Sequence, residues 1–328
     1  MRAIAPGRVN LIGDHTDYTG GLVFPMAINR HTVIDARFTD DSSVSLKSAD
    51  EPDAAHFNLP VRDFSSLQPQ WSRYIAAVAA ECKATQGISG TISTDIPIGS
   101  GLSSSAALEV ATALALGFDG SQQELAQLTQ RAEHAATGVP TGIMDQLCIA
   151  SARENHAMLI DCSTLEIVHS PIPEGCKIVV QFIAHRTLQG SEYSDRVQQC
   201  TTAGSIIGPL RAASIDMVEL IEDVTISKRA RHVITENQRV RAFAQALASH
   251  DLQYAGNLMN EGHRSLAHDF DTSTPTMNKA VEEIQNLPGV YGARMTGGGF
   301  GGCVVALCSR EADVPGWTVS AVGAARLA

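Results

Sequence analysis

The feature that most constrains the fold of this chain is a glycine- and serine-rich stretch that leads directly into an apolar helix. Residues 97–106 read Pro-Ile-Gly-Ser-Gly-Leu-Ser-Ser-Ser-Ala, and the Ala- and Leu-rich composition of 103–117 predicts a helix. The β-branched run over 88–94 precedes the stretch and predicts a strand. The sequence therefore predicts a strand, a tight glycine–serine loop and a helix that begins directly after the loop.

This stretch has the chemistry of an anion site. Glycines allow a tight turn and a close approach of the backbone to a ligand, and the free N–H groups of a first helical turn face an anion. The serines add hydroxyl donors for phosphate oxygens and a candidate ligand for Mg²⁺. A single serine is enough to cap a helix, so a run of three favours phosphate binding over a purely structural turn.

The rest of the 328-residue chain mixes strand and helix signals. Strands are expected over 22–38, 43–46, 88–94, 156–160 and 177–180, and on both sides of the glycines within 291–307. Helices are expected over 71–82, 103–117, 124–136 and most of 191–287. These runs predict an α+β fold with antiparallel sheets and helices on one side, divided into domains of 1–170 and 171–328.

A second glycine cluster, over 295–303, contains the spacing G-x-G-x-x-G. A dinucleotide-binding fold explains it poorly, because that fold needs a following helix and an acidic residue about 20 positions on. Here a strand follows, and residues 320–324 read Ser-Ala-Val-Gly-Ala. Five glycines within six positions instead indicate that a ligand or another loop comes close to the backbone.

A third segment, over 7–18, places Arg8, Asp14, His15 and Asp17 between two glycine turns. Such polar groups suit a polyhydroxylated ligand, because carboxylates accept hydroxyl hydrogens and arginine orients or neutralises charge. A solvated loop with a local Arg–Asp pair explains the pattern about equally well. The basic residues of the expected helix over 225–250 are interpreted as a solvated face; they are Lys228, Arg229, Arg231 and Arg239.

Charge and cysteine content argue against several classes of function. The 24 basic and 35 acidic residues leave a net charge of −11 without a long basic run, so we expect no binding to nucleic acid or membrane. The seven scattered cysteines form no C-x-x-C pair and are typical of buried thiols in a reducing compartment. Because no signal peptide and no membrane-spanning run is evident, we expect a cytoplasmic protein.

The sequence contains neither the P-loop pattern G-x-x-x-x-G-K-[ST] nor the protein-kinase pair H-R-D and D-F-G. A phosphate loop without the P-loop lysine indicates another class of kinase. In order along the chain, GRVNLIGDHTDY (7–18), PIGSGLSSSAALEVA (97–111) and RMTGGGFGGC (294–303) resemble the three motifs of the GHMP small-molecule kinases, and within them the galactokinases. Three further galactokinase-like segments are AEHAATGVPTGIMDQ (132–146), GSEYSDRVQQC (190–200) and RARHVITE (229–236).

The resemblance implies a two-domain GHMP kinase fold with mixed and antiparallel sheets, an active site between the domains, and the use of ATP and Mg²⁺. Asp145 matches the catalytic aspartate beside the C1 hydroxyl of the sugar, and Arg8 matches the arginine that stabilises charge there. Positions matching sugar-binding residues are Arg8, Asp14, His15, Asp17, Gly142, Asp145 and Tyr193. Positions matching ATP-binding residues are Gly99, Ser100, Gly101, Leu102, Ser103, Ser104 and Ser105, with Trp71 near the adenine. Ser105 and Glu133 match the Mg²⁺ ligands.

Two positions depart from the galactokinase pattern. Galactokinases typically have Glu where this chain has Asp14, and the shorter arm retracts the acceptor by one methylene, about 1.5 Å. We expect its contact to the far hydroxyl of the sugar to loosen or to pass through water. The family's Arg-His-Ser-Leu reads His-Arg-Thr-Leu over 185–188, so either His185 or Arg186 takes the cationic role.

The function expected from the resemblance is phosphorylation of the anomeric hydroxyl of α-D-galactose by ATP, giving galactose 1-phosphate and ADP. A kinase for a related sugar, N-acetylgalactosamine or L-arabinose, is the alternative within the enzymes. A non-catalytic sugar and ATP sensor is the alternative from another class, although such a sensor has a shortened serine loop and this chain keeps Ser103, Ser104 and Ser105. The expected partners are the sugar and ATP, and the expected state is a monomer or weak homo-oligomer.

Overall fold

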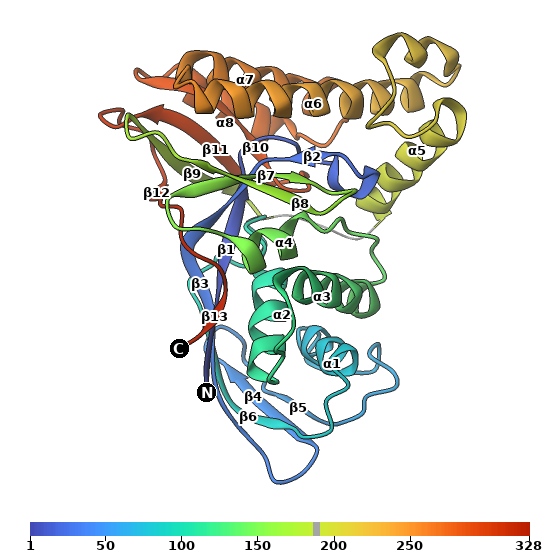
Figure 1. Cartoon of the computed structure of the whole chain (residues 1–328), viewed down its shortest axis with the longest axis vertical. Helices are drawn as coiled ribbons and strands as arrows, with labels where there is room; N and C mark the ends of the chain where they lie inside the picture. Colours follow the sequence, from blue (N-terminus) through green and yellow to red (C-terminus); the bar gives the residue numbers. More distant parts are fainter. Residues whose placement is uncertain (186–190) are drawn as a thin grey trace.

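The computed structural model describes residues 1–185 and 191–328, and its largest sheet has six strands (Figure 1). The strand order is β13-β1-β3-β6-β4-β5, and every neighbouring pair is antiparallel except β4 with β6. These strands are β1 (Arg2–Asn10), β3 (Pro25–Phe38), β4 (Ser43–Ser48), β5 (Ala55–Asn58), β6 (Ile88–Thr94) and β13 (Arg326–Leu327). The sheet is therefore mixed, as the resemblance implies.

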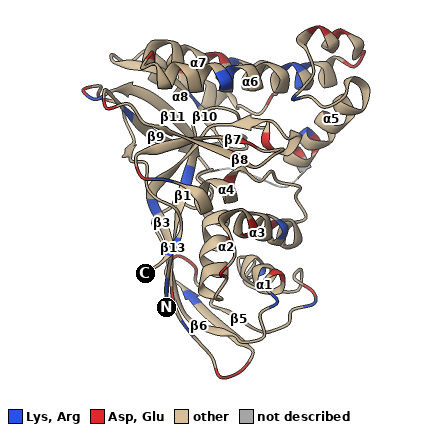
Figure 2. Cartoon of the chain, viewed as in Figure 1, with Lys and Arg blue, Asp and Glu red and all other residues tan. Residues whose placement is uncertain are grey.

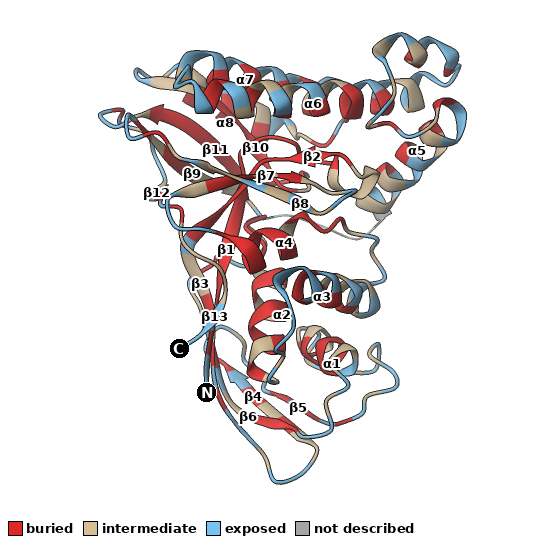
Figure 3. Cartoon of the chain, in the orientation of Figure 1, coloured by how far each residue is buried: buried red, intermediate tan, exposed pale blue. Residues whose placement is uncertain are grey.

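Four helices pack on one side of this sheet: α1 (Ser72–Glu81), α2 (Ser104–Ala115), α3 (Gln122–Thr137) and α4 (Met144–Ser151). Helix α2 lies directly against β1 and β3, and α1 and α3 pack on α2. Both α2 and α4 are buried over most of their length (Figure 3). The starts of the two helices lie close together, because the hydroxyl of Ser103, before α2, donates a hydrogen bond to Asp145 in the first turn of α4.

The other half of the molecule contains two further sheets. One is antiparallel, in the order β10-β11-β9-β12, and the other has the order β2-β7-β8. Their strands are β2 (Leu22–Val23), β7 (His156–Asp161), β8 (Glu166–Pro171), β9 (Cys176–Ala184), β10 (Val290–Thr296), β11 (Gly302–Ser309) and β12 (Trp317–Val319). Helices α5 (Ser191–Ile207), α6 (Val224–Ala248), α7 (Leu252–His268) and α8 (Pro275–Gln285) belong to this half, together with the short 3₁₀ helices η1 (Asp17–Thr19) and η2 (Ile215–Leu220).

Most of the predicted elements are confirmed. Helices α1, α2 and α3 end within two residues of their predicted limits, and a capping box between Ser121 and Glu124 begins α3. The predicted strand over 22–38 is interrupted at Phe24 and gives β2 and β3, which enter different sheets. The proposed domain boundary near residue 170 falls at the end of β8 and stays a prediction.

The segment over 7–18 is not a solvated loop. Its first residues continue strand β1, and Arg8, Asp14 and His15 are each at most 4% exposed. The interpretation of the basic residues of α6 as a solvated face is also wrong in part, because Arg229 is buried and Arg239 pairs with a buried glutamate. Hydrogen-bond or charged partners offset the cost of burying these groups, as Asp145 does for Arg8 and the carbonyl oxygen of Asp269 does for Arg229.

No helix in the described part of the chain is long and apolar enough to cross a membrane. Lysine and arginine positions are dispersed over both halves and interspersed with acidic ones in the view of Figure 2. This distribution agrees with the absence of a long basic run in the sequence.

Candidate active site

A pocket of about 610 Å³ lies where the segment over 7–18, the glycine–serine stretch and the second glycine cluster meet. It receives side chains from β1, from the starts of α2 and α4, from α3 and from α5. The predicted site residues that line it are Arg8, Asp14, His15, Asp17, Trp71, Gly99, Gly101, Ser103, Ser104, Ser105, Glu133, Gly142, Asp145 and Tyr193. Three motifs that are distant in sequence therefore form one site.

Arg8 and Asp145 form a two-bonded ion pair in this pocket. Arg8 Nε donates to Asp145 Oδ1 at 2.7 Å and Nη2 donates to Oδ2 at 2.8 Å. The remaining Arg8 nitrogen, Nη1, donates to the carbonyl oxygen of Gly101 at 2.6 Å. The Arg8 side chain is 5% exposed and that of Asp145 is 26% exposed. Arg8 thus fixes the carboxylate from the protein side, and Asp145 remains open to a ligand.

The glycine–serine stretch forms a tight turn at the start of α2. Gly99, Gly101 and Ser103 have positive φ values of 73°, 79° and 63°. The Ser103 hydroxyl donates a hydrogen bond to Asp145, which couples this loop to the ion pair. Ser100 and Leu102 are buried beneath the turn and do not line the pocket. Ser103, Ser104 and Ser105 line the pocket at the start of α2, where the N–H groups of the first helical turn lack partners within the helix.

Ser105 and Glu133 are neighbours on the wall of the pocket. Ser105 Oγ donates to Glu133 Oε1 at 3.1 Å, and the other carboxylate oxygen accepts hydrogen bonds from Thr141 Oγ1 at 2.7 Å and Gln146 Nε2 at 3.0 Å. Burial raises the pKa of Glu133, and these hydrogen bonds oppose that shift. A hydroxyl and a carboxylate at this spacing are hard oxygen donors of the kind that Mg²⁺ takes beside a phosphate.

His15 lines one end of the pocket and has polar contacts at both ring nitrogens. Its Nε2 lies 3.2 Å from the carbonyl oxygen of Gly298 and its Nδ1 lies 3.1 Å from the hydroxyl oxygen of Tyr18. The ring of Tyr193 lies 5.5 Å from the ring of His15, and the ring of Phe270 lies 4.7 Å away. This end of the site therefore combines polar groups with aromatic faces, as small-molecule sites often do.

Asp17 lies against Gly142. A Cβ atom built on Gly142 would lie 1.9 Å from Asp17 Oδ2, so only glycine leaves space for this carboxylate. Burial and the charge of Asp145 raise the pKa of Asp17 to about 7. The two carboxyl groups, Asp17 and Asp145, thus line one pocket in different environments.

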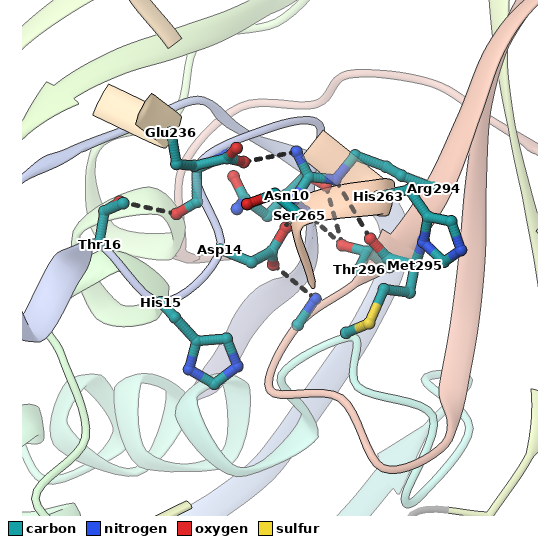
Figure 4. Close-up of polar contacts among 12 residues, drawn as sticks. Asn10, Asp14, His15, Thr16, Glu236, His263, Ser265, Arg294, Met295 and Thr296 are labelled. Carbon is teal, nitrogen blue, oxygen red and sulfur yellow. Dashed lines mark hydrogen bonds and ion pairs between the residues drawn. The ribbon is translucent and has the colours of Figure 1, made fainter. Parts of the chain in front are cut away.

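Asp14 differs from its neighbours because its carboxylate is already bonded within the protein. Oδ2 accepts from Arg294 Nη2 at 2.7 Å and Oδ1 accepts from the backbone N–H of Gly297 at 2.7 Å (Figure 4). Asp14 is 1% exposed. Sequence reasoning placed Asp14 in the site but missed Arg294. The available signal was an arginine inside the apolar strand that precedes the second glycine cluster.

The second glycine cluster permits close contact between loops. A Cβ atom on Gly297 would lie 3.1 Å from the carbonyl oxygen of Gly101, and one on Gly299 would lie 2.5 Å from that of Thr272. Gly297, Gly299 and Gly301 also have positive φ values. The expectation that another loop approaches this backbone is confirmed, and the approaching loop is partly the glycine–serine turn.

Two further predicted residues are Trp71, on the wall of the pocket, and His185, near the phosphate turn. Trp71 precedes α1 and lines the pocket. The Nδ1 atom of His185 lies 3.7 Å from a Cβ atom built on Gly99, so this histidine is next to the turn. Arg186, the other candidate for the cationic role, lies outside the described residues.

The arrangement has the form of a small-molecule kinase, and comparison with known proteins defines its class. The GHMP kinases N terminal domain matches residues 72–153, and the GHMP kinases C terminal domain matches residues 243–315. A mevalonate kinase structure superposes with a TM-score of 0.72 at 20% identity, covering 98% of this chain and 99% of that one, which shows a shared fold. The molecule is built as a GHMP-type kinase.

More similar proteins specify the family. The galactokinase galactose-binding signature matches residues 1–38. The galactokinase of Bos taurus is 41% identical, with 94% of this chain and 83% of that protein covered, and the galactokinase of Chloroflexus aggregans is 42% identical, with 94% and 84% covered. A crystal structure of Lactococcus lactis galactokinase complexed with galactose has a TM-score of 0.93 at 31% identity, covering 99% and 94%. The chain belongs to the galactokinase family.

Proposed function

We propose that this protein transfers the γ-phosphoryl group of ATP to the anomeric hydroxyl of α-D-galactose, giving galactose 1-phosphate and ADP. The observation that carries the proposal is the Arg8–Asp145 pair, which lies in one pocket with the glycine–serine turn. The similarity to galactokinases over most of the chain supports galactose as the sugar. It does not favour N-acetylgalactosamine or L-arabinose, and the intact serine run argues against a sensor.

In the proposed reaction Asp145 accepts a hydrogen bond from the attacking C1 hydroxyl. As the hydroxyl oxygen bonds to the γ-phosphorus, the bond to the β–γ bridging oxygen breaks, ADP leaves, and the hydroxyl proton passes to the Asp145 carboxylate. Arg8 holds both oxygens of that carboxylate and orients it toward the pocket. Positioning and charge stabilisation of this kind provide most of the catalysis in phosphoryl transfer.

The phosphates of ATP would occupy the turn formed by Gly99, Gly101 and Ser103 to Ser105, with Trp71 beside the adenine. Ser105 and Glu133 would hold Mg²⁺, and their adjacent hydroxyl and carboxylate oxygens fit that role. The bound cation would neutralise charge that develops on the phosphate oxygens. Ser100 and Leu102 contribute to the turn by packing beneath it, since both are buried.

The sugar would bind at the end of the pocket lined by His15, Asp17, Gly142 and Tyr193. Asp17 and His15 supply groups that accept or donate hydrogen bonds to hydroxyls, and Tyr193 adds an aromatic face. Asp14 lines the same end, with its carboxylate already bonded to Arg294. A cytoplasmic location, and a monomer or weak homo-oligomer, remain predictions.

The test is an ADP-release assay with ATP and Mg²⁺ over a panel of galactose, N-acetylgalactosamine, glucose, L-arabinose and mevalonate. Turnover with galactose well above every other compound is the expected result. Preferred turnover with another sugar would change the assigned substrate and leave the proposed roles of Arg8 and Asp145 in place. No turnover with any compound would contradict a catalytic function.

A further inference from the structure

A buried network of charges joins the sugar end of the pocket to the interior of the other half of the molecule. Its centre is Arg294, a fully buried residue of β10. Arg294 Nη1 donates to Glu236 Oε1 and Nη2 donates to Asp14 Oδ2, each at 2.7 Å (Figure 4). Glu236, on α6, also accepts from Arg239 Nε at 2.7 Å. Two cations and two anions therefore compensate one another, and only Arg239 among them is partly exposed.

The network holds the backbone around Asp14 as well as its carboxylate. The N–H of Gly13 donates to Glu236 Oε1 at 2.9 Å, and the N–H of Gly297 donates to Asp14 Oδ1 at 2.7 Å. His232 Nε2 lies 3.1 Å from the carbonyl oxygen of Asp14. Burial lowers the pKa of His232 to about 4, so its imidazole is neutral at physiological pH. Both sides of the Asp14 residue are thus fixed from the interior.

The residues that follow Asp14 are the ones proposed to meet the sugar. His15 comes next in the chain, has a φ of 65° and reaches the carbonyl oxygen of Gly298, which adjoins Gly297. Arg294 therefore fixes the position of both His15 and Gly298, the two partners of this contact. It holds the segment over 13–17 through Asp14 and Glu236, and it belongs to the strand that leads into Gly297.

We propose that Arg294 is a positioning residue for sugar binding, and that Asp14 acts through Arg294 by holding the 13–17 segment, without itself supplying the main contact to the sugar. The inference rests on the proposed function only in requiring that some sugar is phosphorylated. It explains why both carboxylate oxygens of Asp14, at the edge of a polar pocket, accept hydrogen bonds from donors of the protein. It also gives a reason for a largely buried ion network, which by itself adds little stability.

The test is a double-mutant cycle on Asp14→Asn and Arg294→Lys, with the sugar that the wild-type enzyme phosphorylates. Lysine keeps the positive charge but cannot bridge two carboxylates as the planar guanidinium does. Each single variant is expected to raise the KM for the sugar about tenfold or more, because a charge-assisted hydrogen bond is lost. The double variant is expected to resemble the worse single variant, because both changes remove the same interaction. The KM for ATP should change less than about twofold.

Two additional variants guard against a failure to fold. A Cβ atom on Gly262, in α7, would lie 2.7 Å from Arg294 Nη1, and Gly262 itself does not line the pocket. Gly262→Ala should therefore displace Arg294 and should also raise the sugar KM. Arg211→Lys is the matched control, because Arg211 pairs with Asp161 at 2.5 Å and does not line the pocket. It should leave both KM values unchanged.

Three results would overturn the inference. Additive effects of Asp14→Asn and Arg294→Lys would mean that Asp14 contacts the sugar independently of Arg294. An unchanged sugar KM in Arg294→Lys and Gly262→Ala would remove the positioning role. An equal rise in the KM for the sugar and the KM for ATP, together with a lower melting temperature, would assign Arg294 a purely structural role. Absence of wild-type activity on every sugar would instead contradict the proposed function. This outcome is seen with the wild-type enzyme alone, so it is distinct from the three results above.

Discussion

Replacing Gly142 with alanine is a direct way to test the placement of Asp17. A Cβ atom at this position would lie 1.9 Å from Asp17 Oδ2, 2.1 Å from Cγ and 2.7 Å from Cβ. Non-bonded carbon atoms prefer separations of roughly 3.5–4 Å, so the Asp17 side chain must move by more than about 1 Å. A displacement of that size at a reacting site lowers the rate about 100-fold, equivalent to about 3 kcal/mol of transition-state stabilisation.

The assay is steady-state ADP release with sugar and ATP varied separately. We expect kcat/KM for the sugar to fall about 100-fold while the KM for ATP stays within about twofold of the wild type. Gly175→Ala is the control, because a Cβ atom on Gly175 meets nothing within 4 Å and the residue does not line the pocket. Wild-type kcat/KM in Gly142→Ala, with the protein folded, would refute the argument that Asp17 must occupy this position.

The remaining predictions concern the two other carboxylates and the titration of Asp17. Asp145→Asn should lower kcat about 1,000-fold while sugar and ATP still bind by calorimetry; a loss smaller than tenfold would contradict its role. Glu133→Gln should raise the Mg²⁺ concentration for half-maximal activity about tenfold, measured by metal titration, and an unchanged titration would remove it as a ligand. The pKa of Asp17 is raised from 3.8 to about 7 by burial and Asp145, so its contribution to stability is present below pH ~4 and is lost as the pH rises toward ~7. Asp17→Asn should therefore raise the melting temperature relative to the wild type more at about pH 8 than at about pH 5, and an equal difference at both would contradict the raised pKa.

Local signals were sufficient to predict the phosphate turn and its helix. Glycine is favoured where φ is positive, as at Gly99 and Gly101, and serines favour a helix start. Both preferences act within a few residues, so they are readable without knowledge of the fold. The same holds for α3, whose capping box and C-terminal Gly138 mark both of its ends.

The predicted character of the segment over 7–18 shows where local reading fails. Its charged residues were equally consistent with a solvated loop, and yet Arg8 and Asp14 are buried. Their partners are Asp145, 137 positions from Arg8, and Arg294, 280 positions from Asp14. Whether a charge can be buried depends on such a partner, and nothing in the neighbouring sequence reports it.

The sequence by itself determined the helices, most strands, the phosphate turn and, through resemblance to a known family, many of the residues that line the pocket. These follow from backbone preferences and hydrophobic periodicity, which are local. Only the tertiary structure decided that β4 pairs parallel with β6, that Gly142 leaves room for Asp17, and that Arg294 binds Asp14 and Glu236 together. Strand pairing, steric space and buried charge compensation arise between distant segments, and they exist only once the chain has folded.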